Sequence, residues 1–156
     1  MTDKKLEEQV EELIKVVTEC AKCVFDELGP GWKEEIYQKA MEVALRSRGV
    51  IYETQRILPI TFDEHVIGES IPDLVVWLKD GHKLAVVIDL KADTGLKEEH
   101  QVQVERYIKE LRKQVRPGEE VYSCGLVINF VKESTSVKLK DGFEDLDGIQ
   151  LLQVQA

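Results

Sequence analysis

The chain has 156 residues, of which 43 % are hydrophobic and 33 % charged, and this fits one globular domain with a sizeable core. Its formal net charge of −9 argues against a protein that binds nucleic acid through a basic surface, but a metal-dependent enzyme needs carboxylates only locally. The N-terminus has no apolar signal-peptide segment and no run reaches the length of a membrane span. We therefore expect an intracellular protein of the cytoplasm or nucleus, neither secreted nor membrane-bound.

Two helices are predicted at the start of the chain. Apolar residues recur at helical spacing over residues 4–28, and Gly29-Pro30-Gly31 ends that helix. A second helix is predicted from about Trp32 to Arg48, with Gly49 as a left-handed cap at its C-terminus. The residues expected on its apolar side are Ile36, Ala40, Val43 and Ala44.

The first helix contains Cys20 and Cys23 in a C-x-x-C arrangement. Zinc and iron–sulfur sites usually take four protein ligands, and Cys124 is the only other cysteine. We interpret the two cysteines as half-buried helix residues. The same helix has an apolar stripe that would serve a partner helix, or a second copy of the chain, as well as the core.

Strands are predicted next, at about 51–62, 66–78 and 84–91. Turns separate them at 63–65 and at 79–82, and the second turn contains the Asp-Gly hairpin signal.

A helix over about 97–114 and a strand over about 121–131 follow, and a right-handed crossover would make this strand a parallel neighbour of the strand before the helix. Short edge strands are expected near 136–139 and 149–154. The sequence thus predicts one α/β domain over residues 1–156, with a core at about 10–131 and a C-terminal extension at 132–156.

Two charged triplets lie on these predicted strands. Ile71-Pro72-Asp73 lies on the strand at 66–78, and Asp89-Leu90-Lys91 follows the apolar run 84–88. Side chains alternate along a strand, so Asp89 and Lys91 must share a face. If Asp73 comes from the neighbouring strand, two carboxylates and one ammonium converge. The alternative is a cross-strand ion pair without further function.

Such a set is suited to phosphodiester hydrolysis. Mg²⁺ prefers hard oxygen ligands, and Asp73, Asp89 and the carbonyl of Leu90 supply three of them. Lys91 would orient or help to deprotonate the attacking water. The candidate metal is Mg²⁺ or Mn²⁺.

Two helices offer further candidates. On the predicted helix over 97–114, Gln103 and Tyr107 lie four residues apart and share the inward face with His100. Gln103 would bind a carboxylate ligand, a metal-bound water or a DNA phosphate, or simply the backbone. Glu34 lies early in the second helix, where the helix dipole alone explains an acidic residue. Glu34 becomes a site candidate if this helix packs beside Asp73.

In this order, these pieces resemble the GxxExxY family of the PD-(D/E)XK nuclease superfamily. The matching motifs are Gly31-x-x-Glu34-x-x-Tyr37, Gly68-Glu69 before Pro72-Asp73, Asp89-Leu90-Lys91-Ala92, His100-x-x-Gln103-x-x-x-Tyr107 and the strand from Gly125 to Phe130. The similarity as a whole covers about residues 10–131.

The resemblance implies a restriction-endonuclease-like αβββαβ core, with a mixed central sheet flanked by helices, an extra N-terminal helix and a short C-terminal β tail. It also implies an Mg²⁺- or Mn²⁺-dependent deoxyribonuclease with DNA as its partner. Carried over by position, Glu34, Asp73 and Asp89 contact the metal and Lys91 is the catalytic lysine. Gln103 and Tyr107 match the QxxxY motif of RecB-type nucleases.

Two positions depart from the family pattern. Asp89 stands where the family usually has Glu, and Ile71 stands where it tends to have an Arg that would bind phosphate. Two other functions therefore stay open: a nuclease fold that binds nucleic acid or protein with an idle site, and an acidic protein-interaction module. The choice between endonuclease and exonuclease is also open.

Overall fold

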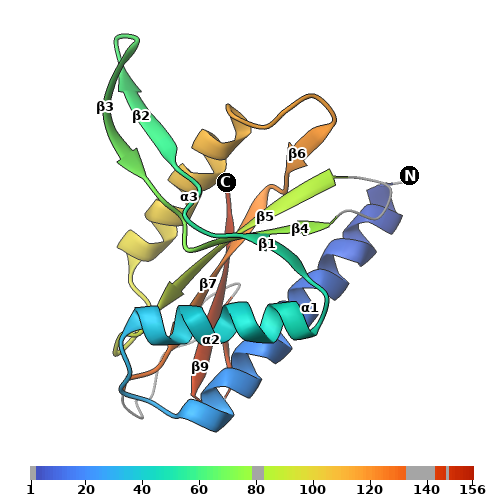
Figure 1. Cartoon of the computed structure of the whole chain (residues 1–156), viewed down its shortest axis with the longest axis vertical. Helices are drawn as coiled ribbons and strands as arrows, with labels where there is room; N and C mark the ends of the chain where they lie inside the picture. Colours follow the sequence, from blue (N-terminus) through green and yellow to red (C-terminus); the bar gives the residue numbers. More distant parts are fainter. Residues whose placement is uncertain (1–2, 79–82, 133–142, 147) are drawn as a thin grey trace.

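The computed structural model describes residues 3–78, 83–132, 143–146 and 148–156, and Figure 1 shows how they are arranged. Two helices begin the chain, α1 (Asp3–Leu28) and α2 (Glu34–Ser47). Gly29, at φ 72°, ends α1, and its N–H donates a hydrogen bond to the carbonyl of Phe25. Gly49 follows α2 at φ 73°, which confirms the predicted left-handed cap.

The other elements form a sheet, a hairpin and one more helix. Their bounds are β1 (Ile51–Glu53), β2 (Leu58–Phe62), β3 (His65–Ser70), β4 (Leu74–Leu78), β5 (Lys83–Lys91), α3 (Glu98–Arg112), β6 (Glu119–Val121), β7 (Cys124–Phe130), β8 (Phe143–Asp145) and β9 (Ile149–Gln155). Within the described residues the main sheet has seven strands, ordered β1-β4-β5-β7-β9-β8 with β6 also paired to β5. β5 and β7 are parallel, as predicted for strands joined by a helix, and β4 is antiparallel to β5.

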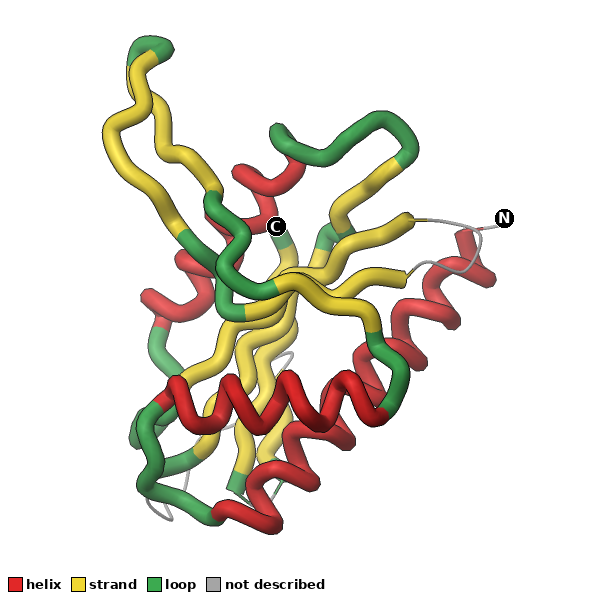
Figure 2. The backbone as a smooth tube through the Cα atoms, in the orientation of Figure 1, coloured by secondary structure: helices red, strands yellow, loops and turns green. Residues whose placement is uncertain are grey.

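Helices cover both faces of this mixed sheet, with α1 and α2 on one face and α3 on the other (Figure 2). Side chains alternate along β5: those of Leu84, Val86, Ile88 and Leu90 pack in the α1–α2 layer, and those of Ala85 and Val87 face α3. The apolar run in β5 is continuous because both faces of the strand are covered. The same alternation places Asp89 and Lys91 on the α3 face.

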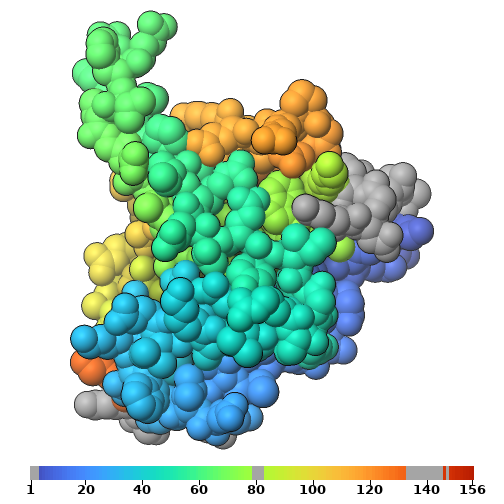
Figure 3. Space-filling view, in the orientation of Figure 1, coloured from blue at the N-terminus to red at the C-terminus, as the bar shows by residue number. Residues whose placement is uncertain are grey.

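β2 and β3 pair only with each other among the described strands and form a hairpin that stands out from the main body (Figure 3). Its two-residue turn is Asp63-Glu64, with φ of 50° and 65°, which is typical of a type I′ hairpin turn. Four large apolar side chains on the hairpin are exposed: Ile60, Phe62, Val66 and Ile67.

This hairpin divides two of the predicted strands. The segment 51–62 is β1 and β2, separated near Gln55 at φ 56°, and the segment 66–78 is β3 and β4. Pro72 has no N–H for a ladder, and Asp73 directly precedes β4 rather than lying within it. The chain leaves the main sheet after β1 and returns to it at Leu74. The predicted strand 121–131 is also divided, into β6 and β7.

The predicted apolar side of α2 is partly wrong. Ile36 and Val43 are exposed, and the buried residues are Tyr37, Met41 and Leu45. These three recur every fourth residue, so they form one helical stripe toward the sheet.

The C-terminal residues contribute to the sheet. The strand predicted at 149–154 is β9, but it lies between β7 and β8 and is therefore not at the edge. The strand predicted near 136–139 lies outside the described residues. Throughout the described ranges, no helix is both long enough and apolar enough to cross a membrane.

Candidate active site

The carboxyl groups of Asp73 and Asp89 are neighbours at one end of β4 and β5. Leu74 pairs with Ile88 in the antiparallel register, so the next position outward brings Asp73 opposite Asp89. Asp73 Oδ2 accepts a hydrogen bond from the backbone N–H of Leu90 at 2.7 Å. This bond ties the Asp73 carboxylate to the backbone of β5. The two aspartates that the sequence placed on neighbouring segments do come together.

Lys91 lies beside this pair. Its Nζ is 3.1 Å from Asp89 Oδ2, and the side chains are 16 % and 2 % exposed respectively. Within the described residues, Asp89 Oδ2 has this ion pair but no hydrogen bond of normal geometry. A buried carboxylate oxygen in that state is costly unless a further cation or donor reaches it.

The electrostatics of the pair reflect this shortage of positive charge. Burial, and then the adjacent Asp73 carboxyl group, raise the pKa of Asp89 to about 8, although Lys91 acts in the opposite direction. For Lys91, burial lowers the pKa, but the carboxylates of Asp89, Glu34 and Asp73 outweigh it and raise the pKa above its ordinary value. The ammonium is therefore the stable form of Lys91.

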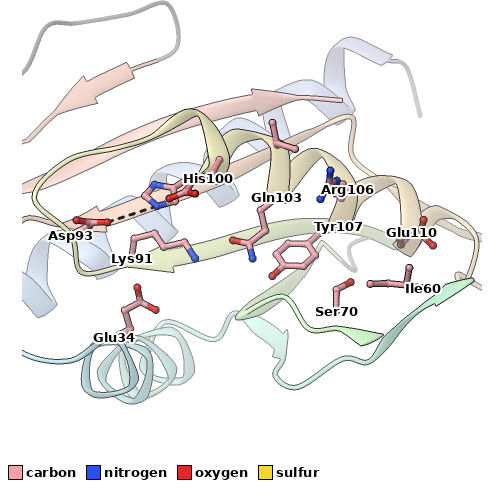
Figure 4. Close-up of a pocket in the computed structure, with 12 residues that line it drawn as sticks. Glu34, Ile60, Ser70, Lys91, Asp93, His100, Gln103, Arg106, Tyr107 and Glu110 are labelled. Atoms are coloured by element: carbon pink, nitrogen blue, oxygen red, sulfur yellow. Dashed lines mark ion pairs between the residues drawn. The ribbon is translucent and has the colours of Figure 1, made fainter. Parts of the chain in front are cut away.

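A cleft of about 920 Å³ opens over Lys91, between α3, the start of α2 and the base of the hairpin (Figure 4). Its lining residues are Glu34, Ile60, Ser70, Lys91, Asp93, Glu99, His100, Val102, Gln103, Arg106, Tyr107 and Glu110. Four of the six predicted site residues, namely Glu34, Lys91, Gln103 and Tyr107, thus line one cleft. The remaining two, Asp73 and Asp89, lie behind Lys91 on the same face of the sheet.

α3 approaches the site closely because β7 has a glycine beneath it. A Cβ on Gly125 would lie 2.6 Å from Cγ1 of Val104, so only glycine allows this packing distance. Tyr107 is buried, and burial followed by the charges of Asp89 and Asp73 raises the pKa of its hydroxyl. The neutral hydroxyl therefore remains a hydrogen-bond donor at the cleft.

His100 lines the cleft from the first turn of α3. Its Nδ1 accepts a hydrogen bond from the backbone N–H of Lys97, and its Nε2 lies 4.0 Å from Asp93 Oδ2. Burial, and then the charge of Lys91, lower the pKa of His100, so its neutral form is favoured. The loop that presents Asp93 is fixed by Asn129, whose side chain bonds both the N–H and the carbonyl of Asp93.

Glu34 is positioned from the opposite layer of the fold. Tyr37 is fully buried, stacks on Phe130 at 4.3 Å, and donates a hydrogen bond to the carbonyl of Gly29 at 2.6 Å. This anchors the Gly29-Pro30-Gly31 turn and the N-terminus of α2. Glu34 then points toward Lys91, as Figure 4 shows. One turn later, Gln38 Nε2 donates to the carbonyl of Asp73 at 3.2 Å, so α2 does pack beside Asp73.

A hard divalent cation fits the Asp73–Asp89 pair. The two carboxyl groups are adjacent, the pKa of Asp89 is raised, and its buried Oδ2 has no hydrogen bond within the described residues. A cation between the two carboxyl groups would stabilise their ionised forms. In a strand, the N–H and C=O of one residue point to the same side, so the carbonyl of Leu90 is expected to face Asp73, to which its N–H donates.

Glu34 is not part of a tight cluster. Across the part of the chain that the structure describes, no group of three or more His, Cys, Asp or Glu residues could hold a metal ion. Glu34 therefore does not join Asp73 and Asp89 as a third close ligand, and its contact with a metal stays a prediction.

The sequence reasoning missed Arg106. It is exposed, lines the cleft and has no ion-pair partner within the described residues. A signal was present, because Arg106 lies three residues after Gln103 and next to Tyr107, on the helix face already singled out. Arg106 therefore offers a cation to the cleft.

Comparison with known proteins agrees with this geometry. The family model described as PD-(D/E)XK nuclease superfamily matches residues 11–141. A comparison with curated proteins gave no match, and neither did one with solved structures. The matched region includes α1 from residue 11 onward, all of α2, the paired aspartates and α3. The chain belongs to the PD-(D/E)XK nuclease superfamily.

Proposed function

We propose that the protein is a deoxyribonuclease of the GxxExxY type that uses Mg²⁺ or Mn²⁺ to hydrolyse phosphodiester bonds. The observation that carries the proposal is the pairing of Asp73 and Asp89 beside Lys91, on the sheet face covered by Gln103 and Tyr107. Superfamily membership supports nuclease chemistry in general. The metal, the DNA substrate and the residue roles are the proposal.

Asp73, Asp89 and the carbonyl of Leu90 would hold the ion, and Glu34 would reach it through a water molecule. When bound there, such an ion supplies charge neutralisation and a more acidic water. The ammonium of Lys91 donates hydrogen bonds to the attacking water or to a phosphoryl oxygen. Gln103 and the neutral Tyr107 hydroxyl bind the phosphate backbone and orient it in the cleft.

The direct test is a panel of linear, nicked, single-stranded and branched DNA incubated with Mn²⁺, with EDTA as the negative condition. Wild type is compared with Asp89→Asn and Lys91→Ala, and with Lys109→Ala as a control on the exposed side of α3. We expect cleavage that falls about a hundredfold or more in the two site variants and persists in the control. Equal cleavage by wild type and Lys91→Ala would indicate a contaminating nuclease and would contradict the proposed role of Lys91.

One alternative has an observation in its favour. Glu34 is separate from the aspartate pair among the described residues, which suits a nuclease fold that binds without cutting. That function predicts salt-dependent DNA binding and calorimetrically measurable Mn²⁺ binding, with no cleavage of any substrate in the panel.

A further inference from the structure

A second pocket continues the active-site cleft beyond Glu34. It has a volume of about 460 Å³ and is lined mainly by Trp32, Lys33, Glu34, Ala92 and Lys132. Glu34 lines both hollows, and Ala92 directly follows Lys91 in the chain. A bound strand that passes Lys91 in the cleft can therefore continue into this second pocket.

The indole of Trp32 is a fixed and exposed surface in this pocket. Trp32 is 51 % exposed, and its Nε1 donates a hydrogen bond to the carbonyl of Leu28 at 2.9 Å. Its backbone N–H bonds the hydroxyl of Tyr37, which is itself stacked on Phe130 in the core. The ring is thus oriented before any ligand arrives, and ordering it on binding costs little entropy.

Two free cations accompany the indole. Lys33 and Lys132 are exposed, and neither has an ion-pair partner within the described residues. The backbone N–H of Lys132 bonds the carbonyl of Asp93, a residue of the main cleft, so this lysine is held close to the active site. Glu35 also lines the pocket and opposes their charge, which leaves an excess of one cation once Glu34 is assigned to the metal.

An oriented aromatic ring that shares a pocket with two ammonium groups has the chemistry that recognises one nucleotide, with its base on the ring and its phosphate bound by the lysines. In a duplex, the bases are stacked and paired, so they cannot reach a single ring on the protein surface. The net charge of −9 also disfavours a long row of phosphate contacts along a double helix.

We propose that this pocket binds an unpaired nucleotide next to the scissile phosphate, so that the substrate is a single strand or a frayed end. The inference rests on the proposed function in two respects, namely that the strand passes through the cleft beside Lys91 and that Glu34 serves the metal. Trp32 stacks on the base, and Lys33 and Lys132 bind the adjoining phosphate.

Tryptophan fluorescence tests this directly, because the chain has two tryptophans and the other, Trp77, is buried. A short oligothymidylate and a duplex of the same length are titrated with Ca²⁺ present, and a gel checks that the DNA stays intact. We expect quenching by the single strand but not by the duplex, and no quenching in Trp32→Phe. In fluorescence anisotropy, affinity should fall about tenfold in Trp32→Ala and recover partly in Trp32→Phe.

The lysines are tested by the salt dependence of the same binding. The double variant Lys33→Gln with Lys132→Gln should lower the slope of log affinity against log salt by about 1.4. The control, Lys4→Gln with Lys109→Gln, removes the same charge from exposed positions outside both pockets and should leave the slope unchanged.

The outcomes separate this inference from the proposed function. Cleavage of DNA with equal binding by wild type and Trp32→Ala would overturn the inference and leave the nuclease intact. Binding that depends on Trp32 without any cleavage would support nucleotide binding in the second pocket and would contradict the proposed nuclease activity. Preference for the duplex, or no binding of either DNA, would overturn the inference.

Discussion

The side-chain amide of Gln38 donates a hydrogen bond to the backbone carbonyl of Asp73 at 3.2 Å, across the boundary between α2 and the sheet. Gln38 lies one turn after Glu34 on the same face of the helix. The bond therefore ties the helix that presents Glu34 to the residue that begins the aspartate pair. Gln38 and Asp73 are thirty-five residues apart in the sequence, and this contact fixes the positions of the two parts of the site relative to each other.

Replacing Gln38 by Leu should affect the site more than the fold. The free energy of unfolding is expected to fall by about 1 kcal/mol, since one part-buried hydrogen bond is lost. Mn²⁺-dependent cleavage should fall about tenfold as Glu34 loses its fixed position. Urea denaturation and initial rates measure the two effects. Gln101→Leu, at an exposed amide on α3, is the control, and equal cleavage by both variants would contradict a positioning role for Gln38.

Tyr37→Phe should destabilise the N-terminus of α2. The ring keeps its stacking on Phe130, but the hydroxyl no longer bonds the carbonyl of Gly29 or the N–H of Trp32. We expect a loss of about 1–2 kcal/mol in the free energy of unfolding, measured by urea denaturation. Tyr52→Phe removes a hydroxyl that bonds Arg46 at an exposed site and should cost less. A larger loss in Tyr52→Phe would refute the assignment of the buried bond.

Asp89 should make the stability of the metal-free protein depend on pH. Its pKa is about 8 in the folded state and near 4 when unfolded, so folding takes up a proton between these values and stability falls as the pH rises through this range. Asp89→Asn removes this penalty. Compared with wild type, the variant should gain several kcal/mol at pH 8, and the gain should vanish near pH 4.

Asp93→Asn is the comparison variant, because the pKa of Asp93 is shifted in the opposite direction from that of Asp89. The hydrogen bond from the backbone N–H of Thr94 is the largest cause that lowers the pKa of Asp93. Its stabilising charge is present at neutral pH and lost in acid, so this variant should lose stability at pH 7 and match wild type in strong acid. Mn²⁺ should raise the melting temperature of wild type but not of Asp89→Asn. The same pH profile for both variants would contradict the assignment.

Gly125→Ala should weaken the contact between α3 and β7. The new methyl group would lie 2.6 Å from Val104 Cγ1 and 3.1 Å from the carbonyl oxygen of Val87, and the backbone cannot yield easily. We expect a loss of about 1–3 kcal/mol in the free energy of unfolding. Gly95→Ala, with no atom within 4 Å of the new methyl, should be neutral or slightly stabilising. Thermal melts of the two variants that coincide would show that α3 does not pack as described.

Much of the fold follows from patterns that are local in sequence. The helical spacing before Gly29 and the continuous apolar run in β5 predict both elements, because a strand covered on both faces needs no polar side. The division of residues 51–78 between two sheets was not predicted. An alternating strand has the same sequence pattern whichever neighbour it pairs with, and only the missing N–H groups of Pro59 and Pro72 hint at the break.

The site shows the same limit. Asp73, Asp89 and Lys91 were found because strand alternation and antiparallel pairing determine where their side chains must point. Trp32 and Arg106 were not, because the sequence of an exposed aromatic or cationic residue is the same whether its side chain faces bulk water or a cleft. Only the packing of α2 and α3 around the sheet end distinguishes the two.

The separation of the β2–β3 arm from the main sheet has a practical consequence. Its hydrogen bonds are made within the arm, so residues added at the Asp63-Glu64 tip leave the register of β4 and β5 unchanged. Ile60 and Ser70 meanwhile place the base of the arm at the rim of the cleft. A dye or affinity peptide grafted onto the tip would report on incoming ligands and immobilise the molecule with the candidate active-site cleft open.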